Sequence, residues 1–423
     1  MALQIIYNLA SFLAALVLAP VGYVLSLFVE KRRKTFAPRL GFQKFPDHGP
    51  TRPIWVHALS VGEAKAAAPL ARALARRHPE RGVVVSASTA TGYEILKEET
   101  QPWVRHVFYY PYDLLFSVKK AFNRVDPALV VIVESDLWPN FLFEAKRRSV
   151  PVVLVNARLS ERSLSGYRRF SFFFRPVFGL FSAVCAASEM QKERFESLLG
   201  DWEKVLVTGN IKFDSRPEEA PATGRQSLGI PEDAPVLVAG STHEGEEEIL
   251  ARLFPLWRES SPGLVLVAAP RDPGRACKAA ELFRSIGLTT ALFSEIVQSP
   301  SPGSDVIVVD AMGALASLYG LADAAFVGAS MIPLGGHNPL EGAAHGKPVV
   351  FGPHMEDFAE IAELLVDERA AIQVVDENEL ESAIRVLLCD REKAEEIGER
   401  AKSVVLANRG AVDKMVEAIS RFL

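Results

Sequence analysis

Ten short runs of Val, Ile, Leu and Ala alternate with longer amphipathic stretches along the chain. In the first half these runs are PIWVH, GVVVSAS, ALVVIVE, VPVVLVNA and AVCAAS, and in the second half they are APVLVAG, GLVLVAAP, DVIVVD, AAFVGA and KPVVFG. Continuous apolar runs separated by helical patterns are typical of parallel strands that helices cover on both faces. A chain of 423 residues is too long for one ordinary core. The sequence therefore predicts an α/β protein with two doubly wound domains.

Composition and charge both divide the chain near residue 214. The segment Ser215–Pro235 is rich in Pro, Gly, Glu and Ser, as interdomain linkers are. Residues 34–214 hold 26 Lys and Arg against 18 Asp and Glu, a net charge of +8, whereas residues 215–423 hold 18 against 33, a net charge of −15. We expect one domain over each range. The basic first domain suits an anionic lipid surface or a phosphorylated substrate, and no nucleic-acid-binding motif accompanies it.

The first 29 residues carry no charged side chain, and Glu30 and the basic stretch KRRK follow them. That length suits one helix across a bilayer. Positive charge after the apolar run places the main body on the cytoplasmic side. Residues 1–33 are therefore expected to form a membrane anchor helix. Because Pro20 and Gly22 can bend it, a helix lying in the interface is the alternative.

Polar residues, Gly and Pro follow nearly every apolar run. Ligands of doubly wound domains bind beyond the carboxyl ends of the strands, so these segments are predicted to line a cleft between two facing domains. In WVHALSVGEA, Glu63 lies where a strand turns into a helix. A carboxylate at that position can cap the helix or act as a catalytic base, and the local sequence leaves both interpretations open.

The stretch GGHNPLEGAAHGKPVVFGP is the richest in the second half. Its paired glycines allow close backbone approach, and a helix that begins near Pro339 presents free N–H groups to a phosphate. A capped helix, with Asn338 as N-cap and Glu341 at N3, is the alternative. Two further strand ends, AAPRDPGR and DAMGALASLYG, offer Arg271, Arg275 and backbone N–H groups to an anion.

Several common motifs are missing from the sequence. There is no Asp-x-Asp pair to clamp a metal ion, no HExxH, Walker A or G-x-S-x-G motif, and no full GxGxxG after a strand. What remains is metal-free nucleotide-sugar chemistry that relies on Arg, Lys and helix N-termini.

Taken in order, the motifs resemble those of the 3-deoxy-D-manno-octulosonic acid (Kdo) transferases, the family 30 glycosyltransferases of lipopolysaccharide biosynthesis. The shared motifs are LGF, WVHALSVGEA, SASTATGYE, YYPYDL, ESDLWPN, NARLSERS, GNIKFD, MGALASLY and GGHNPLEGAAHGKPVVFGP. The resemblance implies a GT-B fold, in which two Rossmann-like domains face a cleft. It also implies CMP-Kdo as donor, the lipid A precursor lipid IVA as acceptor, attachment to inner-membrane lipids, and no cofactor or metal.

The resemblance further implies the site residues. Glu63 matches the proposed base, while Asp136 and Lys212 match the proposed transition-state stabilisers. The predicted contacts to CMP are Pro270, Arg271, Met312, Gly313, Ala314, Asn338, Pro339, Leu340 and Glu341. Asp272 departs from the family, which commonly has His after the Pro-Arg pair. The other reading is a membrane-associated GT-B transferase with a UDP-sugar donor and a lipid-linked acceptor.

The segment Phe170–Phe181, FSFFFRPVFGLF, holds six phenylalanines. At helical spacing they predict either core packing or an exposed face that docks on a membrane or binds acyl chains.

Overall fold

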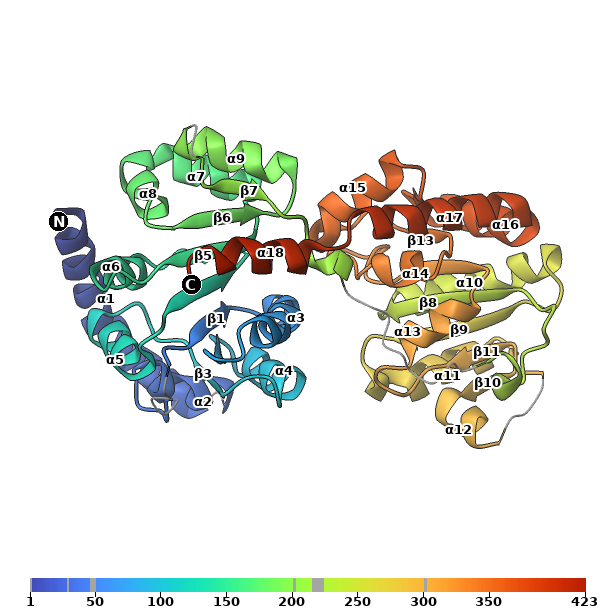
Figure 1. Cartoon of the computed structure of the whole chain (residues 1–423). Helices are drawn as coiled ribbons and strands as arrows, with labels where there is room; N and C mark the ends of the chain where they lie inside the picture. The colour runs from blue at the N-terminus through green and yellow to red at the C-terminus, as the bar shows by residue number, and fades with distance from the viewer. Residues whose placement is uncertain are drawn as a thin grey trace. The chain divides into compact units, whose positions relative to one another are not determined.

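The computed structural model describes residues 2–28, 30–45, 51–134, 136–200, 203–214, 224–299 and 303–423. The chain forms two compact units, shown in Figure 1. Unit 1 comprises Met1–Asp214 and Arg409–Leu423, and unit 2 comprises Ser215–Asn408. The sequence prediction placed residues 409–423 in the second domain, whereas the structure returns them to unit 1. The predicted linker, Ser215–Pro235, lies partly outside the described residues.

In its described part, unit 1 has a seven-stranded parallel sheet of order β3-β2-β1-β4-β5-β6-β7. Its strands are β1 (Ile54–Ala58), β2 (Val83–Ala87), β3 (His106–Tyr109), β4 (Leu129–Val133), β5 (Val152–Ala157), β6 (Ala183–Ala186) and β7 (Val205–Val207). The first six follow the order of a doubly wound Rossmann sheet, in which the chain reverses direction between β1 and β4. Ligands of such sheets bind at this reversal, beyond the carboxyl ends of the strands.

Helices cover both faces of the unit 1 sheet (Figure 1). They are α1 (Ala2–Phe28), α2 (Glu30–Arg39), α3 (Val61–Arg77), α4 (Ala90–Thr100), α5 (Leu115–Val125), α6 (Pro139–Arg147), α7 (Glu161–Arg169), α8 (Ser171–Phe178), α9 (Glu189–Leu199) and α18 (Ala411–Ser420), with the 3-10 turn η1 (Ile211–Asp214). Strand β1 shows why: Ile54 and Val56 belong to a core with α3 and α18, whereas Trp55 belongs to the core on the other face. Both faces of the strand are therefore buried, which explains why its sequence is an almost continuous apolar run.

The C-terminal helix α18 is part of the unit 1 core. Its Met415 and Ile419 are fully buried in the same cluster as the residues of α3. The Asp214 carboxylate, at the end of η1, accepts hydrogen bonds from the backbone N–H groups of Gly410 and Val412, both at 2.6 Å. These bonds satisfy N–H groups that the first turn of α18 leaves unpaired. Helix α18 is thus held at its start as well as along its buried face.

The described part of unit 2 also has a seven-stranded parallel sheet, of order β10-β11-β9-β8-β12-β13-β14. Its strands are β8 (Val236–Thr242), β9 (Val265–Pro270), β10 (Thr290–Leu292), β11 (Val306–Val308), β12 (Ala324–Val327), β13 (Val349–Phe351) and β14 (Ala371–Gln373). Its helices are α10 (Glu246–Ser260), α11 (Ala276–Ser285), α12 (Phe293–Gln298), α13 (Leu315–Leu318), α14 (Leu340–Ala344), α15 (Ala359–Asp367), α16 (Glu377–Cys389) and α17 (Arg391–Ala407), with 3-10 turns η2 (Gln226–Leu228), η3 (Pro273–Arg275), η4 (Tyr319–Leu321) and η5 (Glu356–Phe358). Here the chain reverses direction between β8 and β12.

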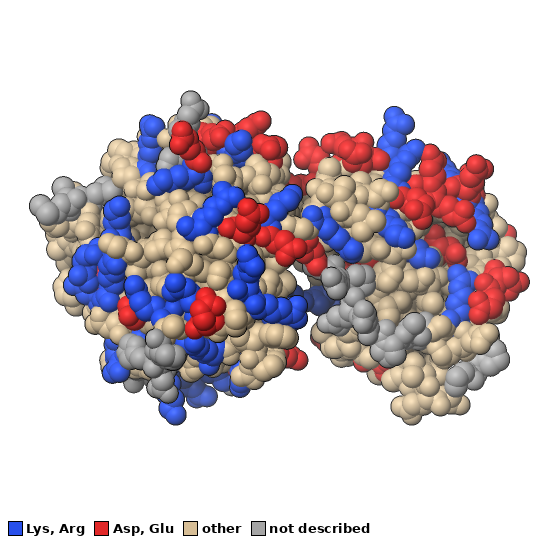
Figure 2. Space-filling view, in the orientation of Figure 1, with Lys and Arg blue, Asp and Glu red and all other residues tan. Residues whose placement is uncertain are grey.

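The prediction of two parallel-sheet α/β domains is confirmed, and all ten apolar runs form strands. The strands that the sequence did not reveal are β3, β7, β10 and β14, each three or four residues long. All four are edge strands, β3 and β7 in the unit 1 sheet and β10 and β14 in the unit 2 sheet. A short edge strand buries less surface than a central strand, so it leaves a weaker apolar signal. Figure 2 shows the charge division: basic side chains spread over unit 1, and acidic ones gather where α15–α17 lie.

Helix α1 is where the structure departs from the predicted spanning anchor over residues 1–33. No helix in the described part of the chain is both long enough and apolar enough to cross a bilayer. Instead, the hydroxyl of Tyr7 donates to Asp113 at 2.9 Å, and the Tyr7 ring lies 5.9 Å from that of Phe173 in α8. Asp113 also accepts from the N–H groups of Asn140 and Phe141 at the start of α6. Helix α1 is therefore fastened to unit 1 by a carboxylate that also caps α6.

Candidate active site

Glu63 and Asp136 follow two neighbouring strands at the reversal of the unit 1 sheet. Strand β1, which precedes Glu63, pairs with β4, which precedes Asp136. Both carboxyl groups are buried, with exposed fractions of 5% and 7%. A buried pair of carboxylates at this edge is unusual because burial disfavours the charged form of each.

Glu63 is both a helix cap and a candidate base. Ser60 is the N-cap of α3 and accepts from the Glu63 N–H at 3.2 Å, while one carboxylate oxygen of Glu63 accepts from the N–H of Leu59. The pKa of Glu63 is raised from 4.5 to about 8. Burial is the main cause, and the negative charges of Asp136 and Glu134 add to it. A carboxyl group with this pKa takes up a proton readily near neutral pH, as a general base must.

Asp136 lies against a fully buried histidine that sequence reasoning did not select. His57 Nε2 is 3.2 Å from Asp136 Oδ2, and its ring stacks on Tyr110 with centroids 3.6 Å apart. Burial lowers the pKa of His57, and Asp136 only partly offsets that effect. We infer that His57 is neutral and presents no positive charge to Asp136. The signal was present in the sequence, because His57 ends the apolar run PIWVH as its only polar residue.

Arg39, the last residue of α2, brings a cation to the same region. Its guanidinium donates to the backbone oxygens of Tyr110 at 3.1 Å and Ser88 at 3.3 Å, and it lies 4.2 Å from the centre of the Tyr112 ring. Burial lowers the pKa of Arg39, and the neighbouring Asp136 acts in the opposite direction. Arg39 directly precedes the LGF motif that supported the resemblance, but its position in the site could not be read from that motif.

Lys212 lies on η1, and Asn156 connects that turn to the carboxyl ends of β4 and β5. The buried Asn156 accepts from the Ile211 N–H at 3.1 Å and faces Glu134 at 3.5 Å. Both Asn156 and Glu134 have positive φ values, 50° and 69°. Side chains in that region cost about 1–3 kcal/mol each, and such strain is concentrated at functional sites. The structure therefore holds the Lys212 turn at the same sheet edge as Glu63 and Asp136.

In unit 2, a close backbone approach shapes the carboxyl edge of the sheet. A Cβ on Gly328, which follows β12, would lie 2.2 Å from the backbone oxygen of Ser241, near the end of β8. The buried Glu246 carboxylate fixes the same loop, since it accepts from the N–H groups of His243, Ala329, Ser330 and Met331 at 2.7–3.1 Å. The loop that leads to the GGHNP motif is thus organised by one acidic side chain.

The predicted contacts to CMP all fall in unit 2, after β9, β11 and β12. Met312 and Gly313 are exposed before α13, and Gly313 has a φ of 80°. Asn338 accepts from the Leu340 N–H at 3.1 Å, but the N-cap of α14 is Pro339 rather than the predicted Asn338, and Glu341 is the second residue of the helix. The remaining members of the predicted set are Pro270, Arg271, Ala314 and Pro339, and each lies at the end or beginning of one of these elements.

The two arginines of AAPRDPGR have different surroundings. Arg275 forms a bidentate ion pair with Glu247, with hydrogen bonds of 3.1 and 3.2 Å. Its guanidinium charge is therefore balanced by a protein carboxylate. The side chain of Arg271 is exposed, while its N–H donates to Thr242 O at 2.9 Å. Asp272 accepts from the Gly274 N–H at 2.9 Å and caps η3. Arg271 is therefore the better candidate for a phosphate ligand.

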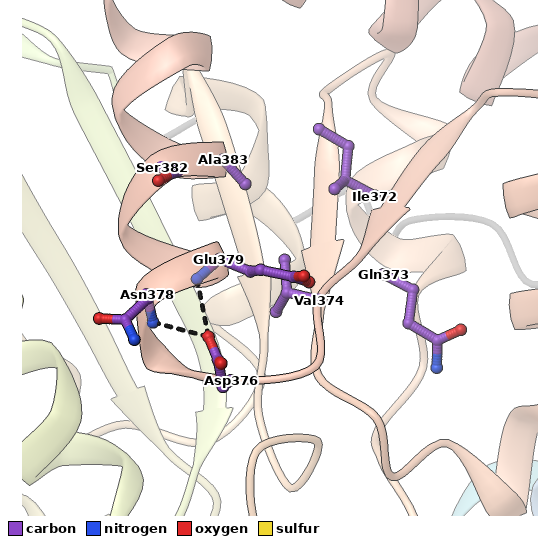
Figure 3. A pocket seen from close by; sticks show the side chains of 8 residues that line it. All are labelled: Ile372, Gln373, Val374, Asp376, Asn378, Glu379, Ser382 and Ala383. Carbon is purple, nitrogen blue, oxygen red and sulfur yellow. Dashed lines mark hydrogen bonds between the residues drawn. The ribbon is translucent and has the colours of Figure 1, made fainter.

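A hollow of about 390 Å³ between β14 and α16, shown in Figure 3, contains none of the predicted site residues. Its polar groups serve the helix start: Asp376 accepts from the N–H groups of Asn378 and Glu379, both at 2.9 Å. Glu379 in turn accepts from the Val375 N–H at 3.0 Å. These bonds form a reciprocal cap of α16, so the hollow is not a candidate active site.

Two solved structures illustrate the fold that this chain shares with other proteins. The UDP-GlcNAc 2-epimerase of Neisseria meningitidis, bound to UDP-GlcNAc, covers 87% of this chain and 100% of its own, with a TM-score of 0.60 and 15% identity. MurG of Acinetobacter baumannii covers 88% and 100%, with a TM-score of 0.54 and 14% identity. These likenesses define the class as two-unit Rossmann-like proteins.

Sequence comparison identifies the family within that class. A family profile described as 3-deoxy-D-manno-octulosonic-acid transferase (kdotransferase) matches residues 34–215. The 3-deoxy-D-manno-octulosonic acid transferase of Haemophilus influenzae is 34% identical, over 96% of both chains, and that of Chlamydophila psittaci is 31% identical, over 93% of this chain and 90% of the relative. The chain belongs to the Kdo transferase family of lipopolysaccharide biosynthesis and is a glycosyltransferase.

Proposed function

We propose that this chain transfers Kdo from CMP-Kdo to lipid IVA, with inversion and without a metal ion. The observation that carries the proposal is Glu63, a buried carboxyl group with a raised pKa at the binding edge of the unit 1 sheet, in a member of the Kdo transferase family. The GT-B fold that the resemblance implies is part of the proposal.

The proposed reaction is a single displacement at the anomeric carbon of Kdo. The acceptor hydroxyl oxygen forms a bond to that carbon while its proton passes to Glu63, and the bond to the CMP phosphate oxygen breaks, leaving its electron pair on CMP. The negative charge of Asp136 stabilises the positive charge that develops on the sugar. Lys212 and Arg271 balance the charge that grows on the phosphate. The backbone N–H groups near Met312 and Asn338 complete the donor site.

Release of CMP tests this proposal against the UDP-sugar alternative. Purified chain, lipid IVA and CMP-Kdo are incubated with EDTA, and CMP is quantified; excess CMP or UDP is added in parallel. We expect CMP release that persists with EDTA and is inhibited by CMP but not by UDP. Inhibition by UDP alone would favour the other donor class, and loss of activity in EDTA would refute metal independence.

The pH dependence of kcat/KM is the first prediction from the site. Glu63 accepts a proton only when it is ionised, so activity should rise as the pH increases through its pKa of about 8. Initial rates measured from pH ~6 to ~9 at lipid concentrations well below KM test this expectation. A rate that is already maximal at the acidic end would mean that the catalytic base has an ordinary carboxyl pKa.

Arg271→Ala should weaken donor binding by about 10- to 100-fold, because a charge-assisted hydrogen bond to phosphate contributes about 1.5–3 kcal/mol. Arg271→Lys keeps the charge but loses the bidentate geometry, so it should recover part of the loss. Calorimetric titration with CMP measures both. Arg284→Ala, an exposed arginine of α11, is the matched control. Equal affinity in Arg271→Ala and the control would remove Arg271 from the donor site.

We also propose that unit 1 docks on the cytoplasmic face of the inner membrane through α1 and α8. Leu9, Phe12, Leu13, Leu16 and Val17 of α1 are each 54–70% exposed and recur at helical spacing. The six-phenylalanine segment is divided: Phe178 and Phe181 are buried, whereas Phe170 and Phe172 are 49% and 74% exposed. An exposed apolar surface on a domain with net positive charge is typical of attachment to anionic lipid.

Vesicle flotation tests this attachment. The whole chain should float with vesicles that contain phosphatidylglycerol, and the double variant Leu9→Glu/Leu16→Glu should remain at the bottom. Phe172→Glu should reduce flotation if α8 shares the contact. Leu256→Glu, which changes an exposed leucine of unit 2, is the control. Undiminished flotation of the double variant would contradict the proposed surface.

A further inference from the structure

A buried chain of polar groups runs across β1 and β2 to Asp136. Trp55 Nε1 donates to Ser86 Oγ at 2.7 Å, Ser86 Oγ is 3.1 Å from His57 Nδ1, and His57 Nε2 is 3.2 Å from Asp136 Oδ2. Trp55, Ser86 and His57 are completely buried, and Asp136 is 7% exposed. His57 and Ser86 are register partners in the β1–β2 pair, so the sheet itself sets their spacing.

The hydrogen-bonding groups along this chain favour one set of directions. The indole N–H can only donate, so Ser86 Oγ accepts from Trp55 and keeps its own proton available to donate to His57 Nδ1. His57 Nε2 and Asp136 Oδ2 are buried atoms that form no hydrogen bond of regular geometry with any described residue, and each is the other's neighbour at 3.2 Å. A lone pair on Nε2 would face a carboxylate, which is repulsive, so the ring proton belongs on Nε2.

We propose that Trp55, Ser86 and His57 form a positioning relay, which holds the Asp136 carboxylate beside Glu63 by presenting one N–H group and no positive charge. The proposal rests on the proposed function for the roles of Glu63 and Asp136. An imidazolium or an arginine would hold Asp136 equally well. It would, however, cancel the negative charge that stabilises the positive charge developing on the sugar. His57 touches neither substrate in this proposal and acts only through Asp136.

The surroundings of His57 support a neutral ring. Its face lies on Tyr110 rather than on solvent, and burial is the main cause that lowers its pKa. The charged groups that act on it are Asp136, which favours protonation, and Arg39, which disfavours it. One competing arrangement exists, because the backbone oxygen of Ser86 also lies 3.1 Å from Nδ1. If the Ser86 hydroxyl group were removed, Nδ1 could take up a proton and donate it to that oxygen. With Nε2 also protonated, the ring would then be an imidazolium.

Nitrogen-15 NMR of the whole chain labelled in histidine tests the relay directly. We expect His57, identified by the signals missing in His57→Gln, to show a protonated Nε2 and an unprotonated Nδ1 throughout the neutral pH range. In Ser86→Ala we expect His57 to titrate as an imidazolium, whereas Ser86→Thr, which keeps the hydroxyl, should retain the wild-type tautomer. Ser117→Ala removes another fully buried serine hydroxyl, in α5, and controls for the loss itself. A wild-type imidazolium, or a proton on Nδ1, would overturn the relay.

The pH profile gives a second readout that a purely structural role would not change. The negative charges of Asp136 and Glu134 raise the pKa of Glu63, and Asp136 also interacts electrostatically with Arg39. In Ser86→Ala the positive ring offsets Asp136, so the acidic limb of kcat/KM should move to lower pH while kcat falls about 10- to 100-fold. His57→Gln keeps a donor near the Nε2 position and should retain more activity than His57→Leu. A profile and kcat in Ser86→Ala that match those of Ser117→Ala would contradict the proposal.

The two proposals can fail separately. If the wild-type chain transfers no Kdo but His57 shows the predicted tautomer, the proposed function fails and the hydrogen-bond relay stands. If transfer proceeds while His57 is an imidazolium, the relay fails and the proposed function stands.

Discussion

Replacing Glu63 with Gln should reduce Kdo transfer by about 10²- to 10⁴-fold, which is the usual contribution of a positioned general base. Glutamine keeps an oxygen that accepts from the Leu59 N–H, so the cap of α3 survives while the proton acceptor is lost. Because the predicted CMP contacts lie in unit 2, CMP should bind with unchanged affinity. Rates measured by CMP release, together with calorimetric titration of CMP, separate the two effects.

Glu98→Gln, which changes an exposed carboxylate of α4, is the matched control and should behave like the wild type. Turnover of Glu63→Gln within a few-fold of that control would remove Glu63 from the role of base. Loss of CMP binding together with turnover would instead indicate that the substitution disturbs more than one proton transfer.

The same substitution should stabilise the fold, and the effect should depend on pH. The folded chain retains the Glu63 proton up to a pKa of about 8, whereas the unfolded chain releases it near 4.5. The contribution of Glu63 to stability is therefore complete below the lower value and is lost as the pH rises to the upper one. At neutral pH the loss is about 3 kcal/mol, and Gln avoids it. The thermal midpoint of the variant should exceed that of the wild type more at pH ~8 than at pH ~5.

Gly336→Ala should destabilise unit 2. Gly336 has a φ of 73°, and an added Cβ would lie 2.9 Å from the His354 backbone oxygen and 2.4 Å from Met355 Sδ. The φ value alone costs about 1–3 kcal/mol for a residue with a side chain, and the backbone contact adds to it. We expect a lower unfolding temperature and weaker CMP binding, because the loop leads directly to Asn338. Calorimetry measures both quantities.

Gly224→Ala is the control in the same unit, since a Cβ there meets nothing within 4 Å and no positive φ is involved. It should leave both the unfolding temperature and the affinity for CMP unchanged. If Gly336→Ala behaves like this control, the conformation of the GGHNP loop is not required for the donor site.

The central strands could be predicted from the sequence because burial on both faces demands continuous apolar runs. The same reasoning could not assign residues 409–423. Helix α18 is amphipathic like its neighbours, and its place in unit 1 depends on the distant Asp214 cap and on packing against α3. Contacts between segments so far apart leave no local periodicity to detect.

The candidate site shows the same limit. Glu63, Asp136 and Arg271 could be selected because each follows an apolar run, where doubly wound sheets bind ligands. His57 and Ser86 lie inside the strands and resemble ordinary buried polar residues until the register pairs them. Arg39 and Asn156 act through backbone oxygens and N–H groups, whose positions depend on the fold. Their roles become visible only when distances are known.

Mass spectrometry of the lipid product tests the central claim most directly. Lipid IVA and CMP-Kdo are incubated with the wild-type chain, with Glu63→Gln and with Glu98→Gln, each shown to be folded by its thermal transition. The account predicts that the wild type and Glu98→Gln convert lipid IVA to a product heavier by whole Kdo residues, and that Glu63→Gln leaves it unmodified. Unmodified lipid IVA after incubation with the folded wild type, or Kdo-bearing lipid from Glu63→Gln at the wild-type rate, would contradict it.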